Sequence, residues 1–161
     1  MIAMSETARK EAEMTEGCEG VVVGVCMSER RGDPKKNVGS GLLQPGVGLV
    51  GDSHAGTAKE ITILARESVD RLWREKGISA EPGFFAENIA TQGLDTASLV
   101  RGSVLEIGRA KLEVMQIGKD PSEAHTYQYK GYSLLPSEGV FCRVIEGGEI
   151  RVGDKVVKMG S

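Results

Sequence analysis

The sequence predicts a mainly β protein, in which a barrel of short strands carries a few short helices. Short apolar segments bounded by glycine recur along the chain, whereas one segment has a clear helical pattern. Glycine makes up 22 of the 161 residues without a regular period, which is typical of many tight turns. A parallel α/β sheet would need a helix after most strands, and the sequence does not supply these helices. We therefore expect a mostly antiparallel β-barrel.

The first strands are separated by a long polar segment. Residues 20–27, GVVVGVCM, are apolar and β-branched and predict a buried strand. Residues 28–47 are rich in Gly, Pro, Lys, Arg and Asn and predict a long loop, which at this length is usually either functional or disordered. A second short strand is expected at residues 61–64.

The helical pattern lies in residues 66–76. Val69, Leu72 and Trp73 share one helical face there, and Gly77 is a natural C-terminal stop. We expect a helix that packs against the barrel through these three apolar side chains.

Short elements follow in the middle of the chain. Residues 88–91 predict a strand, and Asp95 is expected to cap a single helical turn through Val100. Residues 104–107 and 112–117 are apolar segments joined by a short link that contains Gly108-Arg109-Ala110, which predicts a hairpin.

The last segments complete the predicted sheet. Residues 140–145 and 149–152 flank Gly147-Gly148, a two-residue turn signal, and predict a second hairpin. Residues 155–158 are expected to form the strand that closes the sheet.

Composition limits the class of protein. Residues 1–19 are polar, carry both charges and lack the apolar segment of a secretory signal, so we expect a flexible tail before a single domain at residues 20–161. A net charge of −3 argues against a nucleic-acid groove or an anionic membrane surface, and no apolar run approaches the roughly 20 residues that span a bilayer. Three widely spaced cysteines without a CxxC pair favour a reducing cytoplasm.

Four glycine-rich polar segments stand beside predicted strands, at residues 48–56, 83–89, 118–125 and 136–144. Backbone N–H groups in such turns can bind an anion, and His54, Arg66, Lys119 and Arg143 could add positive charge or further donors. Glycine turns in β proteins more often serve only as turns, so composition alone leaves both interpretations open.

An acid and an amide follow two aromatic residues. Glu87-Asn88 comes directly after Phe84 and Phe85 at the start of a predicted strand. The aromatic pair could form the wall of a pocket beside these polar groups, or a core anchor before a capped turn. The two interpretations are equally supported by the sequence.

Neither a metal site nor a reactive thiol is indicated by spacing. Asp52, His54, Glu87 and His125 could coordinate a divalent ion, but no HxH, HExxH or helical pair is present, and we expect no dedicated metal site.

Two cysteines lie in predicted strands. Cys26 precedes Arg31 in a basic loop, which weakly resembles sites where backbone N–H groups and an arginine lower the pKa of a thiol. Such sites normally lead into a helix, and no helical pattern follows here. Cys142 lies between Phe141 and Arg143, where packing as a small apolar residue is the simplest interpretation.

Five motifs in order along residues 20–157 resemble the MOSC domain, which is named from the C-terminal domain of molybdenum cofactor sulfurases. The motifs are GLVGDSHAG, ILARES, GFFAENIATQGLD, LEVMQIGK and PSEGVFCRVIEGGEIRVGD. The resemblance implies a closed or nearly closed β-barrel with short helices. It also implies a role with the molybdenum cofactor (molybdopterin), either in binding it or in carrying sulfur to it as a cysteine persulfide.

A cysteine that many members of this family carry is absent from this sequence. Many bacterial MOSC domains carry a cysteine in the loop after GK, as sulfur carrier or molybdenum ligand, and Pro121 stands where that thiol would fall. Pterin or anion binding depends less on this thiol than persulfide transfer does. If a thiol takes part, Cys142 is the candidate because it lies within a family motif. Pyridoxal phosphate belongs to a separate desulfurase domain of the fused enzymes, and we do not expect it on this chain.

The resemblance places a pterin pocket among the polar loops. We expect the cations to hold the phosphate and the acid and amide to pair with the ring, in a site lined by His54, Arg66, Glu87, Asn88, Lys119 and Arg143. Candidate partners are a molybdoenzyme or a cysteine desulfurase. Two alternatives stay open: a non-catalytic docking or storage barrel that has lost its reactive centre, and a thiol transferase that uses Cys26.

Overall fold

A computed structural model of the chain describes residues 19–57, 59–120, 123 and 127–159. Residues 1–18, on which most of the predicted flexible tail falls, lie outside the described residues, as do Pro121 and His125.

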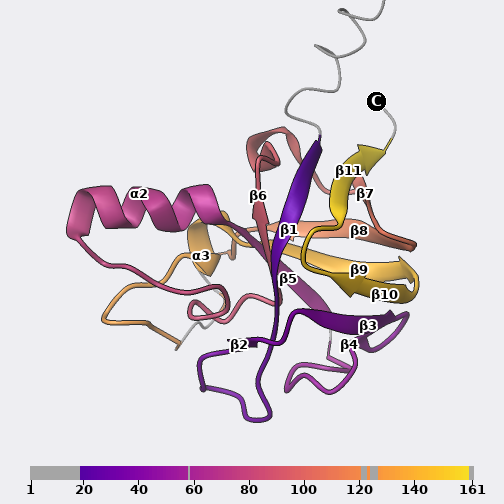
Figure 1. Cartoon of the computed structure of the whole chain (residues 1–161), viewed down its shortest axis with the longest axis horizontal. Helices are drawn as coiled ribbons and strands as arrows, with labels where there is room; N and C mark the ends of the chain where they lie inside the picture. The colour runs from indigo at the N-terminus through magenta and orange to yellow at the C-terminus, as the bar shows by residue number, and fades with distance from the viewer. Residues whose placement is uncertain (1–18, 58, 121–122, 124–126, 160–161) are drawn as a thin grey trace, which may run out of the picture.

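Seven strands close a barrel (Figure 1), in the order β11–β7–β8–β9–β5–β6–β1, and β1 pairs with β11 to complete the circle. Their bounds are β1 Glu19–Met27, β5 Ile61–Ala65, β6 Ile89–Gln92, β7 Val104–Ile107, β8 Ala110–Ile117, β9 Val140–Glu146 and β11 Lys155–Met159. β5 and β6 run parallel, because helix α2 connects them, and the other barrel pairings are antiparallel. The prediction of a mainly β, mostly antiparallel barrel is confirmed.

Helix α2 spans Arg66–Lys76, as predicted. Gly77 ends it in the left-handed conformation at φ 70°, and its N–H donates to the Trp73 carbonyl. Val69 and Leu72 are buried, but Trp73 is 57% exposed, so its predicted packing on the barrel is wrong. Figure 1 shows α2 extending away from the barrel, and its buried residues are Ser68, Val69 and Leu72.

Residues 28–47 contain two short strands instead of a continuous loop. β2 (Lys36–Asn37) pairs with the end of β1, and β3 (Ser40–Gln44) pairs with β4 (Gly48–Leu49) and with β10 (Gly148–Arg151).

The predicted hairpin around Gly147-Gly148 is therefore wrong, because β10 pairs with β3 and not with β9. A Cβ on Gly147 would lie 2.6 Å from the Leu43 carbonyl oxygen. This glycine allows a close backbone approach between two segments distant in sequence.

The other predicted turns are confirmed. Asp95 Oδ1 accepts from the Ala97 N–H at 3.1 Å and caps the short helix η1 (Thr96–Ser98). β7 and β8 form the predicted hairpin.

Two apolar clusters hold these elements together. One fills the barrel, and its members include Val22, Ile63 and Leu112. The second joins α2 to the barrel and to α3 (Leu135–Glu138) through residues such as Leu72 and Leu135. None of the helices in the described part of the chain is both long and apolar enough to cross a membrane.

Candidate functional site

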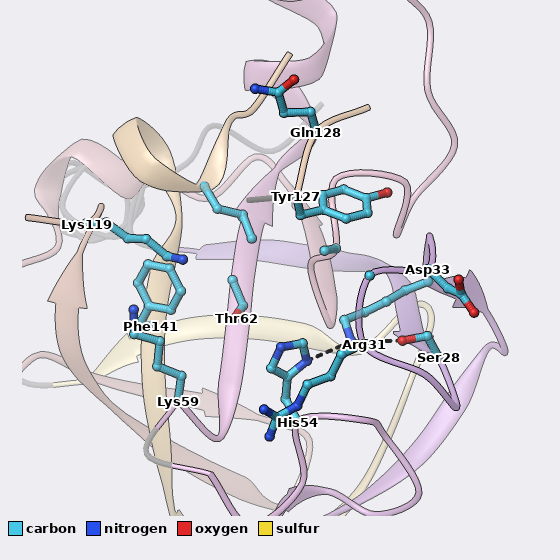
Figure 2. Close-up of a pocket in the computed structure, with 14 residues that line it drawn as sticks. Ser28, Arg31, Asp33, His54, Lys59, Thr62, Lys119, Tyr127, Gln128 and Phe141 are labelled. Carbon is cyan, nitrogen blue, oxygen red and sulfur yellow. Dashed lines mark hydrogen bonds between the residues drawn. The ribbon is translucent and has the colours of Figure 1, made fainter. Parts of the chain in front are cut away.

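A cavity of about 420 Å³ opens where the segments that follow β1 and β8 meet (Figure 2). Its volume lies within the range of roughly 300–1,000 Å³ that is usual for small-molecule sites. Basic and aromatic residues make up half of its lining, which comprises Ser28, Arg31, Gly32, Asp33, Lys35, His54, Lys59, Thr62, Ala86, Lys119, Tyr127, Gln128, Leu135 and Phe141.

A buried ion pair forms the back of the cavity. The Lys35 Nζ atom lies 2.7 Å from Asp52 Oδ1, and both side chains are almost inaccessible to solvent. The backbone N–H groups of Ser28 and His54 each donate to an Asp52 carboxylate oxygen at 3.1 Å. Burial disfavours ionisation, but the hydrogen bond and charge of Lys35 hold the pKa of Asp52 below its ordinary value. The pair is a fixed part of the wall.

Gly83 sets the position of the segment that carries Lys35. Its φ is +95°, and a Cβ there would lie 2.5 Å from the Lys35 carbonyl oxygen. The Lys35 N–H donates to the Gly83 carbonyl at 3.0 Å. Glycine is required here because any other residue would be strained and would push the two backbones apart.

His54 lines the cavity as a neutral imidazole. Its side chain is 40% exposed, and Nδ1 lies 3.4 Å from Lys35 Nζ. Burial lowers the pKa of His54, as do the positive charges of Lys35, Arg31 and Lys119, while Asp52 opposes them. Because the pKa falls below its ordinary value, the ring is largely uncharged at pH 7.

Two lysines border the ring of Phe141. Lys59 Nζ lies 4.7 Å and Lys119 Nζ lies 6.0 Å from the ring centroid, and Figure 2 shows both beside the ring. Lys59 also pairs with Glu123 at 2.6 Å. Hydrogen bonds from Lys59 and Gln116 hold the pKa of Glu123 at about 2. Burial, then the charge of Lys59, lowers the pKa of Lys119, which Glu123 opposes.

The turn before Lys119 is also fixed by glycine. Gly118 has a φ of +66°, and a Cβ there would lie 2.7 Å from the Pro136 carbonyl oxygen. That same carbonyl accepts from the Lys119 N–H at 2.8 Å. The predicted segments at 118–125 and 136–144 are therefore joined beside the cavity.

Glu87 and Asn88 lie behind Ala86, which lines the cavity, and both are buried. Asn88 links two strands, because its Oδ1 accepts from the Thr62 N–H at 3.0 Å and its Nδ2 donates to the Cys26 carbonyl at 3.3 Å.

The carboxylate of Glu87 is only partly satisfied. Its Oε1 accepts from the Phe85 N–H at 3.1 Å, whereas no group in the described part of the chain hydrogen-bonds to Oε2. Burial raises the pKa of Glu87 to about 7, against the opposing effects of backbone N–H groups and Arg66.

The two predicted arginines lie away from the cavity. Arg66 donates to the Ala80 carbonyl at 2.7 Å and lines a different hollow, beside Trp73. Arg143 points outward from β9 and pairs with Glu113 at 2.5 Å. Of the six predicted site residues, the structure thus brings only His54 and Lys119 together as lining residues.

Both cysteines in the described part of the chain are buried. Burial raises the pKa of the Cys26 thiol to about 12 and also raises the pKa of Cys142. Since the thiolate is the nucleophile, neither thiol is poised for reaction at the cavity.

Sequence reasoning missed Lys35, Lys59 and Tyr127, and considered Arg31 only as a neighbour of a thiol. One signal was available, since Arg31 and Lys35 lie in the long basic segment after the first strand. Lys59 and Tyr127 belong to no motif, and only the fold brings them to the cavity. Among the described residues, no three His, Cys, Asp or Glu side chains gather in a way that could hold a metal ion.

Comparison with known proteins identifies a family and a fold. The model of the MOSC domain matches residues 50–157. The fold is similar to that of the YuaD protein from Bacillus subtilis, with a TM-score of 0.69, 18% identity, and coverage of 89% of this chain and 97% of that one.

Two YiiM structures are also similar. The protein from Escherichia coli gives a TM-score of 0.62 at 19% identity, with 89% of this chain and 70% of that chain covered. The protein from Geobacillus stearothermophilus gives 0.59 at 19% identity, with 88% and 73% covered. At these identities the likeness shows the fold alone. The chain has no significant match among curated proteins.

Proposed function

Because the chain belongs to the MOSC domain family, we propose that its cationic cavity binds the phosphorylated pterin of the molybdenum cofactor. The resemblance drawn from the five sequence motifs is confirmed by the match to the family. The family supplies the class of ligand, and the residues of the cavity supply the mode of binding.

The observation that carries this proposal is the concentration of positive charge around a small cavity. Arg31, Lys35, Lys59 and Lys119 all line it. A phosphomonoester carries a charge of about −1.5 to −2 at pH 7, and charge-assisted hydrogen bonds to it are roughly twice as strong as neutral ones. We assign the phosphate to Lys59 and Lys119, with His54 as an additional donor.

Phe141 supplies the apolar part of the same site. Its ring lies beside the two lysine ammonium groups. Phe141 is 3% exposed, so it offers a small apolar part of the wall that a pterin ring can contact while its phosphate contacts the cations. In this proposal Glu87 and Asn88 act from behind the wall, because they are buried and Asn88 joins strands β1 and β5. Arg66 and Arg143 are not part of the proposed phosphate site.

The residues present fit the phosphate and pterin of the cofactor better than its metal. When bound, the cofactor would supply the redox chemistry of molybdenum. The described residues offer no reactive thiol to the cavity, since Cys26 and Cys142 are buried with raised thiol pKa values. We therefore propose binding, with delivery to a molybdoenzyme as its purpose. Persulfide transfer from a cysteine desulfurase would need Cys18, which lies outside the described residues.

Cofactor content of the purified protein tests this proposal. The full chain is produced in a molybdate-replete bacterial host and analysed for molybdenum and for the fluorescent pterin released by oxidation. We expect pterin in the wild type and less in Lys119→Ala. Lys111→Ala is the matched control, because Lys111 pairs with Glu146 at 3.8 Å and does not line the cavity. Equal pterin in all three proteins would contradict the assignment of Lys119, and none in the wild type would contradict the function.

One observation favours the alternative of a non-catalytic docking barrel. Trp73 is 57% exposed beside a hollow that Phe84 and Tyr129 also line. Exposed aromatic residues of this kind are common at protein interfaces. The alternative predicts that wild-type protein carries no pterin and that Trp73→Ala weakens binding to a purified molybdoenzyme.

A further inference from the structure

The Nδ1 atom of His54 has two polar neighbours within hydrogen-bond distance, while the Asp52 Oδ2 atom lies farther away, at 3.8 Å. Lys35 Nζ lies 3.4 Å away and Ser53 Oγ lies 3.3 Å away. Which of these groups donates decides which nitrogen of the imidazole carries its proton.

The ammonium group of Lys35 can only donate. It has three hydrogens, and its three neighbours are Asp52 Oδ1 at 2.7 Å, Ser28 Oγ at 3.4 Å and His54 Nδ1 at 3.4 Å. A proton on Nδ1 would point at this cation. Nδ1 must therefore be the acceptor.

A chain of hydroxyl groups leads to the same assignment. Ser28 Oγ accepts from Lys35, so its own hydrogen is directed to Ser53 Oγ, 3.1 Å away. With Ser53 Oγ accepting from Ser28, its own hydrogen is available for donation to His54 Nδ1, 3.3 Å away. Both routes leave Nδ1 unprotonated, and a neutral imidazole then carries its proton on Nε2.

The opposite edge of the ring is the one available to a ligand. His54 lines the cavity and its side chain is 40% exposed, while Lys35 and Ser53 occupy the Nδ1 edge. Figure 2 shows the ring beside Arg31. His54 thus presents an N–H donor to the cavity, and the cations that line the cavity are donors without acceptor capacity.

We propose that Lys35 fixes His54 as a neutral Nε2–H donor, and that the cavity consequently selects a fully deprotonated oxyanion over one that keeps an acidic O–H. The ligand class rests on the proposed function, whereas the tautomer of His54 does not. Lys35 is a positioning residue here, and His54 is the residue that determines specificity.

The cations around His54 agree with this role, because Arg31 and Lys119 oppose protonation of the ring, as Lys35 does. Asp52 favours protonation, but its Oδ1 is paired with Lys35 at 2.7 Å and its Oδ2 lies 3.8 Å from Nδ1, beyond hydrogen-bond distance. Asp33 also lines the cavity and could accept a proton, but Figure 2 shows it on the far side from Lys59 and Lys119.

The tautomer is measured by nuclear magnetic resonance on the full chain. The chain has two histidines, so His125→Gln leaves His54 as the single imidazole. With ¹⁵N-labelled histidine, long-range proton–nitrogen spectra distinguish the two neutral tautomers and the cation. We expect the Nε2–H pattern at pH 7, with protonation at a pH below the ordinary value for histidine. An Nδ1–H pattern or a cation at pH 7 would overturn the proposal.

The role of Lys35 is tested by a double variant. Lys35→Met/Asp52→Leu removes both charges of the buried pair and keeps an apolar filling, so that the protein can fold, as checked by circular dichroism. We expect both neutral tautomers of His54 to be populated in this variant. A pure Nε2–H pattern there would assign control to Ser53 and overturn the role of Lys35.

Selectivity is tested by calorimetry with sulfate and phenyl phosphate between pH 5 and 8. Sulfate presents only acceptor oxygens throughout, whereas a phosphomonoester gains a proton near pH 6. We expect the affinity for phenyl phosphate, relative to sulfate, to fall about tenfold per pH unit below pH 6, because the monoanion is rejected. A constant ratio would overturn the selectivity. Binding of neither anion by the wild type would overturn the proposed phosphate site while leaving the spectroscopic result on His54 intact.

Two substitutions separate donation from packing. His54→Leu should weaken sulfate binding about tenfold or more, and His54→Gln should restore most of that loss, since its amide N–H is also a neutral donor. Equal losses in both variants would show a purely structural role for the ring.

Discussion

Two ion pairs border the same cavity and differ in burial rather than in geometry. Lys35 and Asp52 are 2.7 Å apart, and Lys59 and Glu123 are 2.6 Å apart. The first pair is almost completely buried, whereas the side chains of the second are 34% and 31% exposed. The two pairs show that the distance between the charged atoms does not decide whether an ion pair serves the structure or the ligand, because these distances are nearly equal.

Burial separates the two roles. A buried pair lacks water to replace a lost partner, so it is fixed and can orient its neighbours. The exposed pair is screened by solvent, and its lysine can exchange the carboxylate for a ligand anion. We therefore propose that the Lys35–Asp52 pair stabilises the wall of the cavity and that Lys59 of the Lys59–Glu123 pair binds the ligand.

The largest effect is expected from Lys35→Met. This change leaves the Asp52 carboxylate buried without its cation, which should lower the free energy of unfolding by about 3–5 kcal/mol. Urea denaturation at pH 7 measures the loss. The double variant Lys35→Met/Asp52→Leu should recover most of it, and a loss below about 1 kcal/mol in the single variant would contradict the structural role of the pair.

Glu87 extends the comparison to a buried acid that has no cation as a close partner. Its Oε1 accepts from a backbone N–H, and no described group hydrogen-bonds to its Oε2. Burial raises its pKa from the ordinary 4.5 to about 7. Its contribution to stability is complete below pH 4.5 and is lost as pH rises through 7, because the folded state holds the proton that the unfolded state has released. The contribution lost is about 3 kcal/mol.

Glu87→Gln should therefore remove this fall in the free energy of unfolding between pH 4.5 and pH 8. The variant should match the wild type near pH 4.5 and exceed it near pH 8, as measured by urea denaturation across that range. Parallel profiles for the two proteins would show that Glu87 ionises normally in the fold.

The smallest effect is expected from Glu123→Gln, on the exposed side of the comparison. Thermal stability should not change measurably, because solvent screens this pair. Anion binding should tighten by about two- to fivefold, since Lys59 loses its competing carboxylate. Calorimetry with sulfate measures this change, and weaker binding would show that Glu123 orients Lys59 for the ligand.

Local patterns were sufficient to predict much of the fold. The boundaries of α2 and the cap at Asp95 follow from residues adjacent in sequence, and both are confirmed. The pairing of β10 with β3 could not be predicted, because Gly147 serves a contact with Leu43 that only the fold creates.

The candidate site was less accessible to sequence reasoning. His54 and Lys119 lie in family motifs, and both line the cavity. Lys35 and Lys59 reach it from segments without a motif, so their convergence required the fold. The motif that contains Arg143 predicts a place in the pocket, yet the alternation of side chains along β9 turns Arg143 to the exterior, where it pairs with Glu113.

The central claim is that the cations of the cavity hold the phosphate of a pterin, and one calorimetric comparison tests it most directly. A phosphorylated pterin and its dephosphorylated form are titrated into the wild type, Lys119→Ala and the control Lys111→Ala. We expect Lys119→Ala to weaken binding of the phosphorylated form by about 10- to 150-fold, the effect of removing one charge-assisted contact. The dephosphorylated form should bind weakly and equally to all three proteins. Equal binding of the phosphorylated form by wild type and Lys119→Ala, or equal binding of both pterins by the wild type, would contradict the claim.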